Sequence, residues 1–289
     1  MDIISDIKYT FKKGSVLTRL IYVNLGVFLV IKLVGVFSIL AGQPFSLAYW
    51  LALPSGVNDL ILRPHTLITY MFLHENFLHI LFNLLGLYWF GKLFLYNFEG
   101  NKLLSVYLLG GIAGGILYMV SYSVFPVFAS ARGLLLGASA SVFAVLVAVA
   151  VYEPNREIGL MFIGRVALKY VAGFYVLLSV LSISSSNPGG NIAHLGGAAW
   201  GWFYIYQLRR GKDWGRGLVK LLNKVPGMFS QKSKMKVTYK QPPRDDYEYN
   251  RRKNLKQEEI NRILDKIAKS GYESLTKEEK ELLFKQGKK

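Results

Sequence analysis

The stretch that decides the fold is the run NIAHLGGAAWG, which extends from Asn191 to Gly201. One ionisable side chain, that of His194, stands here among small and apolar residues. Gly197 and Gly201 lie four positions apart and therefore share one face of a helix. A Gly-x-x-x-Gly face lets two membrane helices approach closely. The run predicts a helix buried inside a bundle, with a histidine close to a neighbouring helix.

The composition of the whole chain is that of a membrane protein. Of its 289 residues, 52% are hydrophobic and only 18% are charged, whereas soluble domains are about 25% charged. The mean hydropathy is +0.28, and a spanning helix needs roughly 20 apolar residues. These properties argue against an ordinary soluble enzyme. They predict an all-α membrane protein with six transmembrane helices, at about residues 17–41, 77–98, 103–125, 139–152, 166–184 and 192–208.

Positive charge is concentrated after the sixth predicted span. The chain has a net charge of +17, and residues 209–289 hold 23 of its 35 Lys/Arg against 11 of its 18 Asp/Glu, a net of +12. Because Lys and Arg collect in cytoplasmic loops, we expect a multi-pass protein of the inner cell membrane with both termini in the cytoplasm. The predicted division is an N-terminal cytoplasmic or interfacial segment (1–16), a six-helix domain (17–208), a basic linker (209–256) and a small helical hairpin (257–289).

Two segments flank the first predicted span. Residues 42–74 contain aromatic side chains, three prolines and few charges. This composition favours a lid at the membrane interface or a re-entrant structure over a plain linker. Near the N-terminus, Ile3, Ile4, Ile7 and Phe11 have helical spacing. That pattern fits an interfacial helix and a disordered segment equally well.

Residues 209–289 are predicted to form an appendage of the membrane domain. Thr276 and Glu279 have the spacing of a capping box, which predicts the start of a helix. The basic tail and the hairpin fit a surface for anionic lipid headgroups or a docking module for a protein partner. We expect no nucleic-acid partner.

Ser139 opens the fourth predicted span within the run Gly137-Ala138-Ser139. Such a serine either caps the helix or acts as a nucleophile beside free backbone N–H groups. The fourth and sixth spans both run from outside to inside, so Ser139 and His194 are expected at similar depth. A histidine at hydrogen-bond distance can take the serine proton and return it to a leaving amine.

The sequence permits a Ser–His dyad rather than a triad. The chain has no cysteine, which excludes thiolate nucleophiles and thiolate metal sites. No acidic residue falls within the fourth or sixth span. Phe143 lies one helical turn beyond Ser139 and is expected to pack its ring against His194.

His79 and Asn83 lie four positions apart at the start of the second span and share a helix face. They are candidates for stabilising an oxyanion on a carbonyl, and a structural hydrogen-bond network is the alternative. The run from His74 to His79 nearly matches the zinc-protease motif H-E-x-x-H but has one residue too many. On a helix, this spacing turns the second histidine about 140° away from the first. We therefore expect no metal site and no cofactor.

Together these motifs resemble the rhomboid family of intramembrane serine proteases, over about residues 15–208. In order they are TYMFLH (69–74), HILFN (79–83), GAS (137–139) and AHLGG (193–197), followed by Gly201. The resemblance, to bacterial members with a C-terminal cytoplasmic tail, implies that Ser139 is the nucleophile and His194 the general base and acid. It also implies an oxyanion site formed by His79, Asn83 and the Ser139 backbone N–H. His74 matches a position that is structural in the family.

The resemblance implies cleavage of transmembrane segments of other membrane proteins, near the outer surface and at small residues. Three positions depart from the family pattern: Ala140 replaces a glycine, Phe143 a tyrosine and His65 a tryptophan. The methyl group of Ala140 is expected to crowd the oxyanion site, and His65 to alter the packing of the lid. The alternative function is that of a catalytically silent rhomboid-like protein that binds or escorts transmembrane clients.

Overall fold

The computed structural model describes residues 3–43, 45–160, 164–184, 187–222 and 246–286. Contacts divide the chain into two compact units, Met1–Gln231 and Lys232–Lys289. The α-helices of the first unit are α1 (Ile3–Lys13), α2 (Val16–Leu40), α3 (Leu47–Leu51), α4 (Val57–Leu62), α5 (Thr66–Thr69), α6 (Phe77–Asn97), α7 (Gly100–Val124), α8 (Ser139–Tyr152), α9 (Leu168–Leu181), α10 (Pro188–Arg209) and α11 (Arg216–Leu222). Its 3₁₀ helices are η1 (Tyr70–Phe72), η2 (Pro126–Phe128) and η3 (Ser182–Ser184). Its strands are β1 (Leu53–Pro54), β2 (Leu134–Leu135), β3 (Glu157–Leu160) and β4 (Gly164–Ala167).

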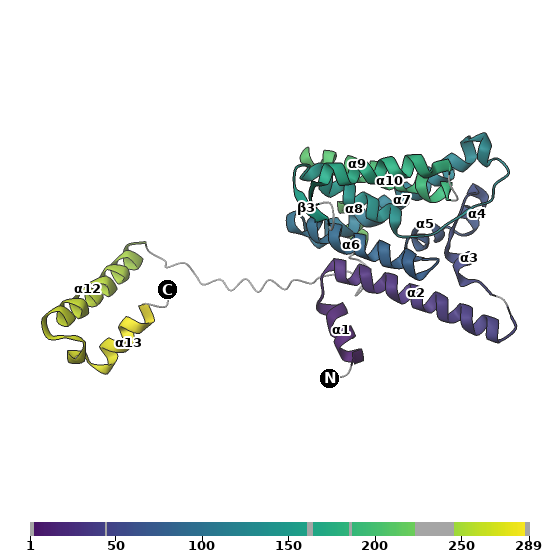
Figure 1. The fold of residues 1–289 in the computed structure, drawn as a ribbon. Helices are drawn as coiled ribbons and strands as arrows, with labels where there is room; N and C mark the ends of the chain where they lie inside the picture. Colours follow the sequence, from purple (N-terminus) through teal and green to yellow (C-terminus); the bar gives the residue numbers. More distant parts are fainter. Residues whose placement is uncertain (1–2, 44, 161–163, 185–186, 223–245, 287–289) are drawn as a thin grey trace. The chain divides into compact units, whose positions relative to one another are not determined.

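Helix α8 lies at the centre of the bundle (Figure 1). It packs against α6, α7, α9 and α10, and ten of its 14 residues are buried. Most of these buried residues are Ala and Val, whose short side chains leave room for several neighbouring helices. The first turn of α8 therefore faces other helices of the bundle.

Each of the six predicted spans overlaps one helix, in order α2, α6, α7, α8, α9 and α10. Among the described helices, α2, α6 and α7 are long and apolar enough to cross a membrane, and α8 and α9 are shorter apolar helices. The predicted fold class, an all-α membrane bundle, is confirmed.

The segment predicted to be a lid, residues 42–74, folds into the short helices α3, α4, α5 and η1. Strand β1 within it pairs with β2, which lies just before α8, so that Leu53 stands opposite Leu135. Ser55 reinforces this pairing, because its N–H donates to the Gly133 carbonyl and its Oγ accepts from the Gly133 N–H, both at 3.1 Å. The lid is thus joined to the segment that leads into Ser139.

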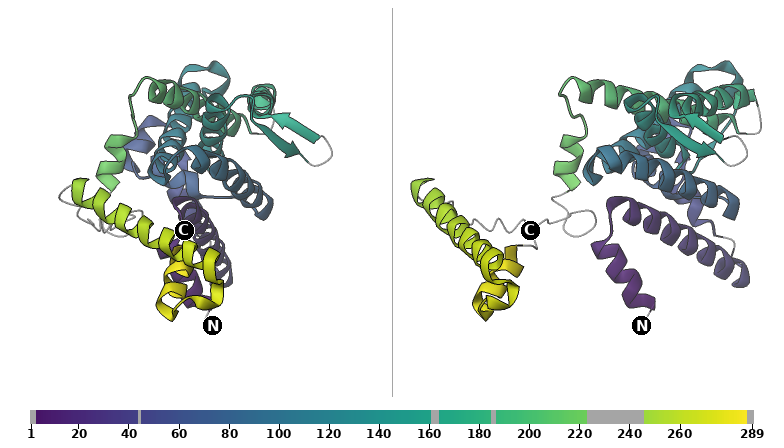
Figure 2. Two further views of the ribbon diagram at one scale, coloured as in Figure 1. Left: turned by 90° about the vertical axis from the view of Figure 1, so that its left-hand side faces the viewer. Right: turned by 60° about the vertical axis from the view of Figure 1, so that its left-hand side comes forward.

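A short hairpin that the sequence analysis does not predict connects α8 and α9. Strands β3 and β4 pair antiparallel, with Glu157 opposite Ala167, and Figure 2 shows them projecting from the helices. The fifth span, predicted from residue 166, begins at Leu168 because Val166 belongs to β4. The last two residues of β4, Val166 and Ala167, are apolar, and over so few residues the end of a strand is not distinguishable from the start of an apolar helix.

The sixth span begins earlier than its predicted start at residue 192. Helix α10 starts at Pro188, a residue suited to the first helical position. Asn187 caps it, because its Oδ1 accepts the N–H of Gly190 at 2.9 Å. This cap places His194 in the second turn of α10.

The N-terminal segment is helical, which is one of the two structures its pattern allows. Helix α1 ends at Lys13, and the buried side chain of Arg19 closes its C-terminal end. The guanidinium donates to the carbonyls of Phe11 and Lys12 at 3.0 and 2.9 Å. These carbonyls lie in the last turn of α1, where no helical N–H is left to pair with them.

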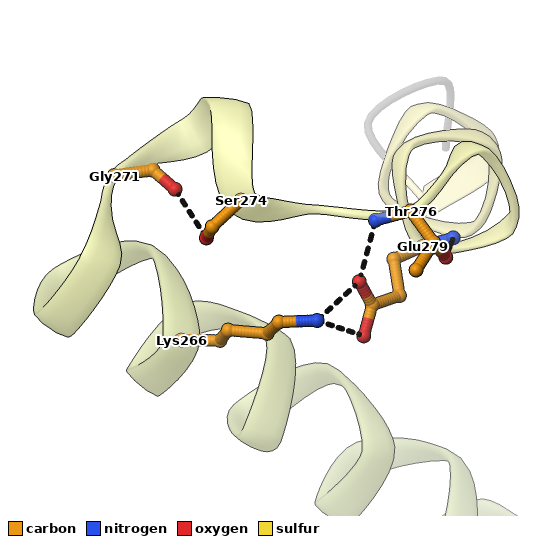
Figure 3. A network of polar contacts seen from close by, with 5 residues as sticks. All are labelled: Lys266, Gly271, Ser274, Thr276 and Glu279. Atoms are coloured by element: carbon orange, nitrogen blue, oxygen red, sulfur yellow. Dashed lines mark hydrogen bonds and ion pairs between the residues drawn. The ribbon is translucent and has the colours of Figure 1, made fainter.

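The second unit is a helical hairpin built from α12 (Asp246–Ser270), η4 (Tyr272–Ser274) and α13 (Lys277–Gln286). The predicted capping box is present (Figure 3): the Glu279 carboxylate accepts the Thr276 N–H at 2.8 Å, and the Glu279 N–H donates to Thr276 Oγ1 at 3.3 Å. Lys266 of α12 pairs with the same carboxylate at 2.9 Å. Glu279 therefore both caps α13 and links it to α12.

The hairpin begins earlier than predicted. Helix α12 starts at Asp246, inside the segment 209–256 that was predicted to be a linker, and α11 also lies in that segment. The residues before 257 are polar helix formers such as Lys and Arg, and they lack the apolar stripe on which the prediction depended. Residues 223–245 of the predicted linker lie outside the described residues.

Candidate active site

Ser139 is the first residue of α8, and its side chain does not cap the helix. The N-cap is Ala138, which makes no side-chain capping bond. Gly137 before it has φ +127°, a left-handed conformation that favours glycine. Its N–H donates to the Tyr70 carbonyl at 3.0 Å. The turn that leads into α8 is thus hydrogen-bonded to the lid. Because Ser139 does not cap the helix, its Oγ can bond to another side chain.

That partner is His194 on α10. The distance between His194 Nε2 and Ser139 Oγ is 2.8 Å, a hydrogen bond between residues 55 positions apart. Both side chains are half-buried. The structure therefore brings together the two residues that the sequence analysis selected as nucleophile and base.

The glycines of α10 allow this contact. A Cβ atom at Gly197 would overlap the carbonyl oxygen of Ala140, and one at Gly201 would overlap that of Ala144. Helix α10 therefore packs directly on the backbone of α8 over two turns. A larger residue at either glycine would separate the helices that carry Ser139 and His194.

Two further side chains hold the imidazole of His194. Phe143 stacks on it, with ring centroids 4.3 Å apart and an interplanar angle of 12°. On the other ring nitrogen, Nδ1 lies 3.2 Å from the Oγ of Ser179 in α9. Ser179 is only 3% exposed and also donates to the Tyr175 carbonyl at 3.0 Å.

Ser179 is a site residue that is not predicted from the sequence. A single serine in an apolar span is common, and it usually bonds to the carbonyl four residues earlier. The residue lies inside the predicted span 166–184, but nothing in its local pattern points to α10.

His79 borders the same space as Ser139. It lies in the first turn of α6, where Asn76 Oδ1 accepts its N–H at 2.9 Å. A Cβ atom on Gly137 would be 3.0 Å from His79 Nε2 and 3.6 Å from Ser139 Oγ. Asn83 is buried and donates one amide N–H to the His79 carbonyl at 2.8 Å. Its amide group has a second N–H for another acceptor.

His74 and His79 do not have the relation that their spacing predicts for one helix. His74 precedes α6, so the two histidines do not lie on one continuous helix, and their rings meet edge to face with centroids 5.2 Å apart. The expected separation of about 140°, which requires both histidines on one helix, is therefore wrong. Across the described ranges, however, no three His, Asp or Glu side chains gather in a way that could hold a metal ion.

The two other departures from the family pattern are Ala140, which packs against α7, and His65, which lies in the lid. Ala140 is buried, and its methyl group faces α7, where a Cβ on Gly114 would come within 2.6 Å of it. The expectation that this methyl crowds the oxyanion site is therefore wrong, because the absence of a side chain at Gly114 accommodates it. His65 lies in the lid, where its Nε2 is 3.0 Å from the Trp50 carbonyl oxygen.

Comparison with known proteins identifies the class to which this bundle and its Ser–His pair belong. Residues 62–211, just over half of the chain, match the Rhomboid domain family. The chain therefore belongs to the rhomboid family, as its motifs indicate, and is a multi-pass membrane protein. Residues 245–289 match a second family, described as a family of unknown function (DUF6576).

Two curated relatives resemble the membrane domain. One is the RHOMBOID-like protein 12, mitochondrial, of Arabidopsis thaliana, which is 30% identical over 161 residues, or 52% of this chain and 48% of the relative. The other is the Presenilin-associated rhomboid-like protein A, mitochondrial, of Danio rerio, which is 28% identical over 169 residues, or 57% of this chain and 42% of the relative. The chain thus spans less than half the length of either relative.

Proposed function

We propose that this protein is an intramembrane serine endopeptidase with Ser139 as nucleophile and His194 as general base and acid. The observation that carries the proposal is the 2.8 Å contact between Ser139 Oγ and His194 Nε2. A nucleophile and a base within hydrogen-bond reach are the structural mark of this chemistry. The fixed ring of His194 supports the same assignment, because a base must be oriented as well as close.

The proposed reaction has two halves. In the first, Ser139 Oγ bonds to the scissile carbonyl carbon, its proton moves to His194 Nε2, and the carbonyl π electrons move to the oxygen. The C–N bond then breaks, and His194 gives the proton to the leaving amine. In the second half, water adds to the acyl ester and gives His194 a proton, which returns to Ser139 Oγ as the new carboxyl end departs.

The negative charge on the carbonyl oxygen needs hydrogen-bond donors. The proposed donors are His79 Nε2, the second amide N–H of Asn83 and the backbone N–H of Ser139. The space beside Gly137 that His79 Nε2 and Ser139 Oγ both border supports this assignment. The N–H of Glu75 lies 3.5 Å from His79 Nδ1, an arrangement that favours the proton of His79 on Nε2.

The proposed substrates are transmembrane segments of other membrane proteins. A peptide bond inside a regular helix is shielded by its own hydrogen bonds, so the cleaved segment must unwind locally to present its carbonyl to Ser139. A small residue at the cut fits a site formed by the closely packed ends of α6, α8 and α10.

Loss of the hydroxyl at Ser139 tests the proposal. We expect the purified full-length protein to cleave a transmembrane test substrate, and Ser139→Ala to abolish that cleavage. Ser141→Ala is the matched control, since Ser141 is a buried serine in the first turn of the same helix and contacts Met71 instead of His194. Undiminished cleavage by Ser139→Ala would refute the proposal. Binding of the substrate without cleavage by the wild type would support the escort function instead.

We further infer that the protein lies in the inner cell membrane and that both of its termini face the cytoplasm. The basic tail would then contact anionic lipid headgroups. The absence of cysteine makes the orientation directly measurable. A cysteine at the exposed position Ala131 should react with an impermeant maleimide added outside intact cells. A cysteine at the exposed position Lys212 should react only after permeabilisation. The reverse pattern would overturn the assigned orientation.

A further inference from the structure

We propose that Ser179 is a positioning residue that completes the Ser139–His194 pair by holding the histidine proton on Nδ1. The three side chains form a continuous series across three helices: Ser139 on α8, His194 on α10 and Ser179 on α9. The distances along it are 2.8 Å and 3.2 Å. A hydroxyl thus occupies the place that a carboxylate takes in a triad.

The hydrogen atoms of this series can be assigned by counting donors. A serine hydroxyl has one proton, and that of Ser179 is donated to the Tyr175 carbonyl at 3.0 Å. Its oxygen can therefore only accept from His194, which requires the histidine proton on Nδ1. Nε2 is then a free acceptor for the Ser139 hydroxyl. In the opposite arrangement, Ser179 donates to His194 and its bond to Tyr175 is lost, while Ser139 loses its acceptor.

The surroundings of His194 also fix the position of its ring. Phe143 covers one face of the imidazole with near-parallel stacking, and Tyr175 meets the Phe143 ring edge-on with centroids 6.0 Å apart. Ser179 is buried and follows Tyr175 by one turn of α9. The ring is therefore held at one face by an aromatic ring and at its far nitrogen by a hydrogen bond.

A hydroxyl in this place suits a site within the membrane. A buried carboxylate carries a large desolvation cost there, whereas a neutral hydroxyl accepts the Nδ1 proton without bringing a charge. When His194 becomes an imidazolium during the reaction, its Nδ1–H keeps the same acceptor. Ser179 thus orients the base in both protonation states.

The tautomer can be measured without any substrate. The chain contains four histidines, so ¹⁵N-histidine labelling of the full-length protein in detergent gives four rings, and a His194→Asn variant identifies the relevant one. We expect a bonded proton on Nδ1 of His194 and none on Nε2, and a mixture of both tautomers in Ser179→Ala. A proton on Nε2 in the wild type, or an unchanged spectrum in Ser179→Ala, would overturn the inference.

The kinetic test rests on the proposed protease function and is therefore separate. We expect Ser179→Ala to lower kcat about tenfold with KM unchanged, the scale of one lost hydrogen bond, and Ser179→Thr to keep kcat within about threefold because it retains the hydroxyl. Ser123→Ala is the control, since Ser123 makes the same type of bond to the carbonyl four residues earlier. Equal kcat in Ser179→Ala and wild type would contradict the positioning role. A wild type that cleaves nothing would count against the protease alone.

Discussion

Helices α2 and α10 contain glycines with opposite roles. A Cβ atom added to Gly26 or Gly35 of α2 would meet nothing within 4 Å, whereas one added to Gly197 or Gly201 of α10 would overlap the backbone of α8. Five of the 25 residues of α2 are buried, compared with ten of the 22 residues of α10. Helix α2 therefore presents most of its surface to lipid, and α10 presents much of its own to other helices.

This difference explains why hydropathy and small-residue spacing give different information. Lipid-facing helices need apolar side chains along their whole length, so hydropathy identifies α2 readily. A helix packed inside a bundle needs small side chains where another backbone approaches it, and these lower its hydropathy. The helix that carries His194 is therefore absent from the described helices that hydropathy and length alone mark as spans.

The largest effect on stability is expected when a glycine of α10 that contacts α8 is replaced by leucine. Gly197→Leu places a side chain against the Ala140 carbonyl, which is backbone and cannot rotate away. We expect it to destabilise the fold by more than about 3 kcal/mol, above the usual cost of overpacking, and to abolish activity. Thermal unfolding in detergent measures the effect.

Gly35→Leu is the control for this experiment. Its side chain would point into open space on α2, so a change within about 0.5 kcal/mol is expected. Equal destabilisation by both variants would show that the distinction between the two helices is wrong.

A smaller effect should come from a pair of small residues where α7 meets α8. A Cβ on Gly110 would overlap the Cβ of Ala144, so Gly110→Ala is expected to cost about 1–3 kcal/mol of unfolding free energy. Ala144→Gly alone should cost about 1 kcal/mol through lost helix propensity. In the double variant the overlap is relieved, so its cost should be at least about 0.5 kcal/mol below the sum of the single costs. Simple additivity in the double-mutant cycle would contradict the predicted contact.

The smallest effect is expected in the helical hairpin, which lies outside the membrane domain. The Thr276 N–H and the Lys266 ammonium favour the ionised carboxylate of Glu279 and hold its pKa below the usual value of 4.5. Because the pKa of Glu279 is lower in the folded hairpin than in the unfolded chain, its ionisation stabilises the fold at pH values above the unfolded-state pKa. This contribution is lost as the pH falls through the folded-state pKa.

Hydrogen exchange of the full-length protein measures this dependence. Protection of the first amides of α13 should decrease below about pH 4.5 in the wild type, and Glu279→Gln should be less protected at neutral pH and lack this step. An identical pH dependence in Glu279→Gln would assign the effect to another group.

Much of the site can be predicted from the sequence because its motifs are local. The pair His79 and Asn83 and the Gly197–Gly201 face each lie within one helix, where spacing alone determines which residues share a face. The depth of Ser139 relative to His194 follows from the alternating direction of successive spans. These inferences need no knowledge of which helices touch.

The remaining features depend on contacts between distant segments. The pairing of β1 with β2 and the bond from Ser179 to His194 join residues whose local sequence is compatible with several partners. The direction of the Ala140 methyl depends on Gly114, 26 residues earlier in the chain. The start of α12 was missed because polar helix formers carry no apolar period.

The most direct test of the account is covalent labelling of Ser139 by a fluorophosphonate probe, located by mass spectrometry. Labelling needs an activated hydroxyl but no knowledge of the natural substrate. We predict that the wild type is modified at Ser139 and that His194→Ala loses at least about 99% of the labelling rate, the scale of general-base catalysis. Labelling at the same rate without His194, or no labelling of the wild type, would contradict the claim that these two side chains form a catalytic pair.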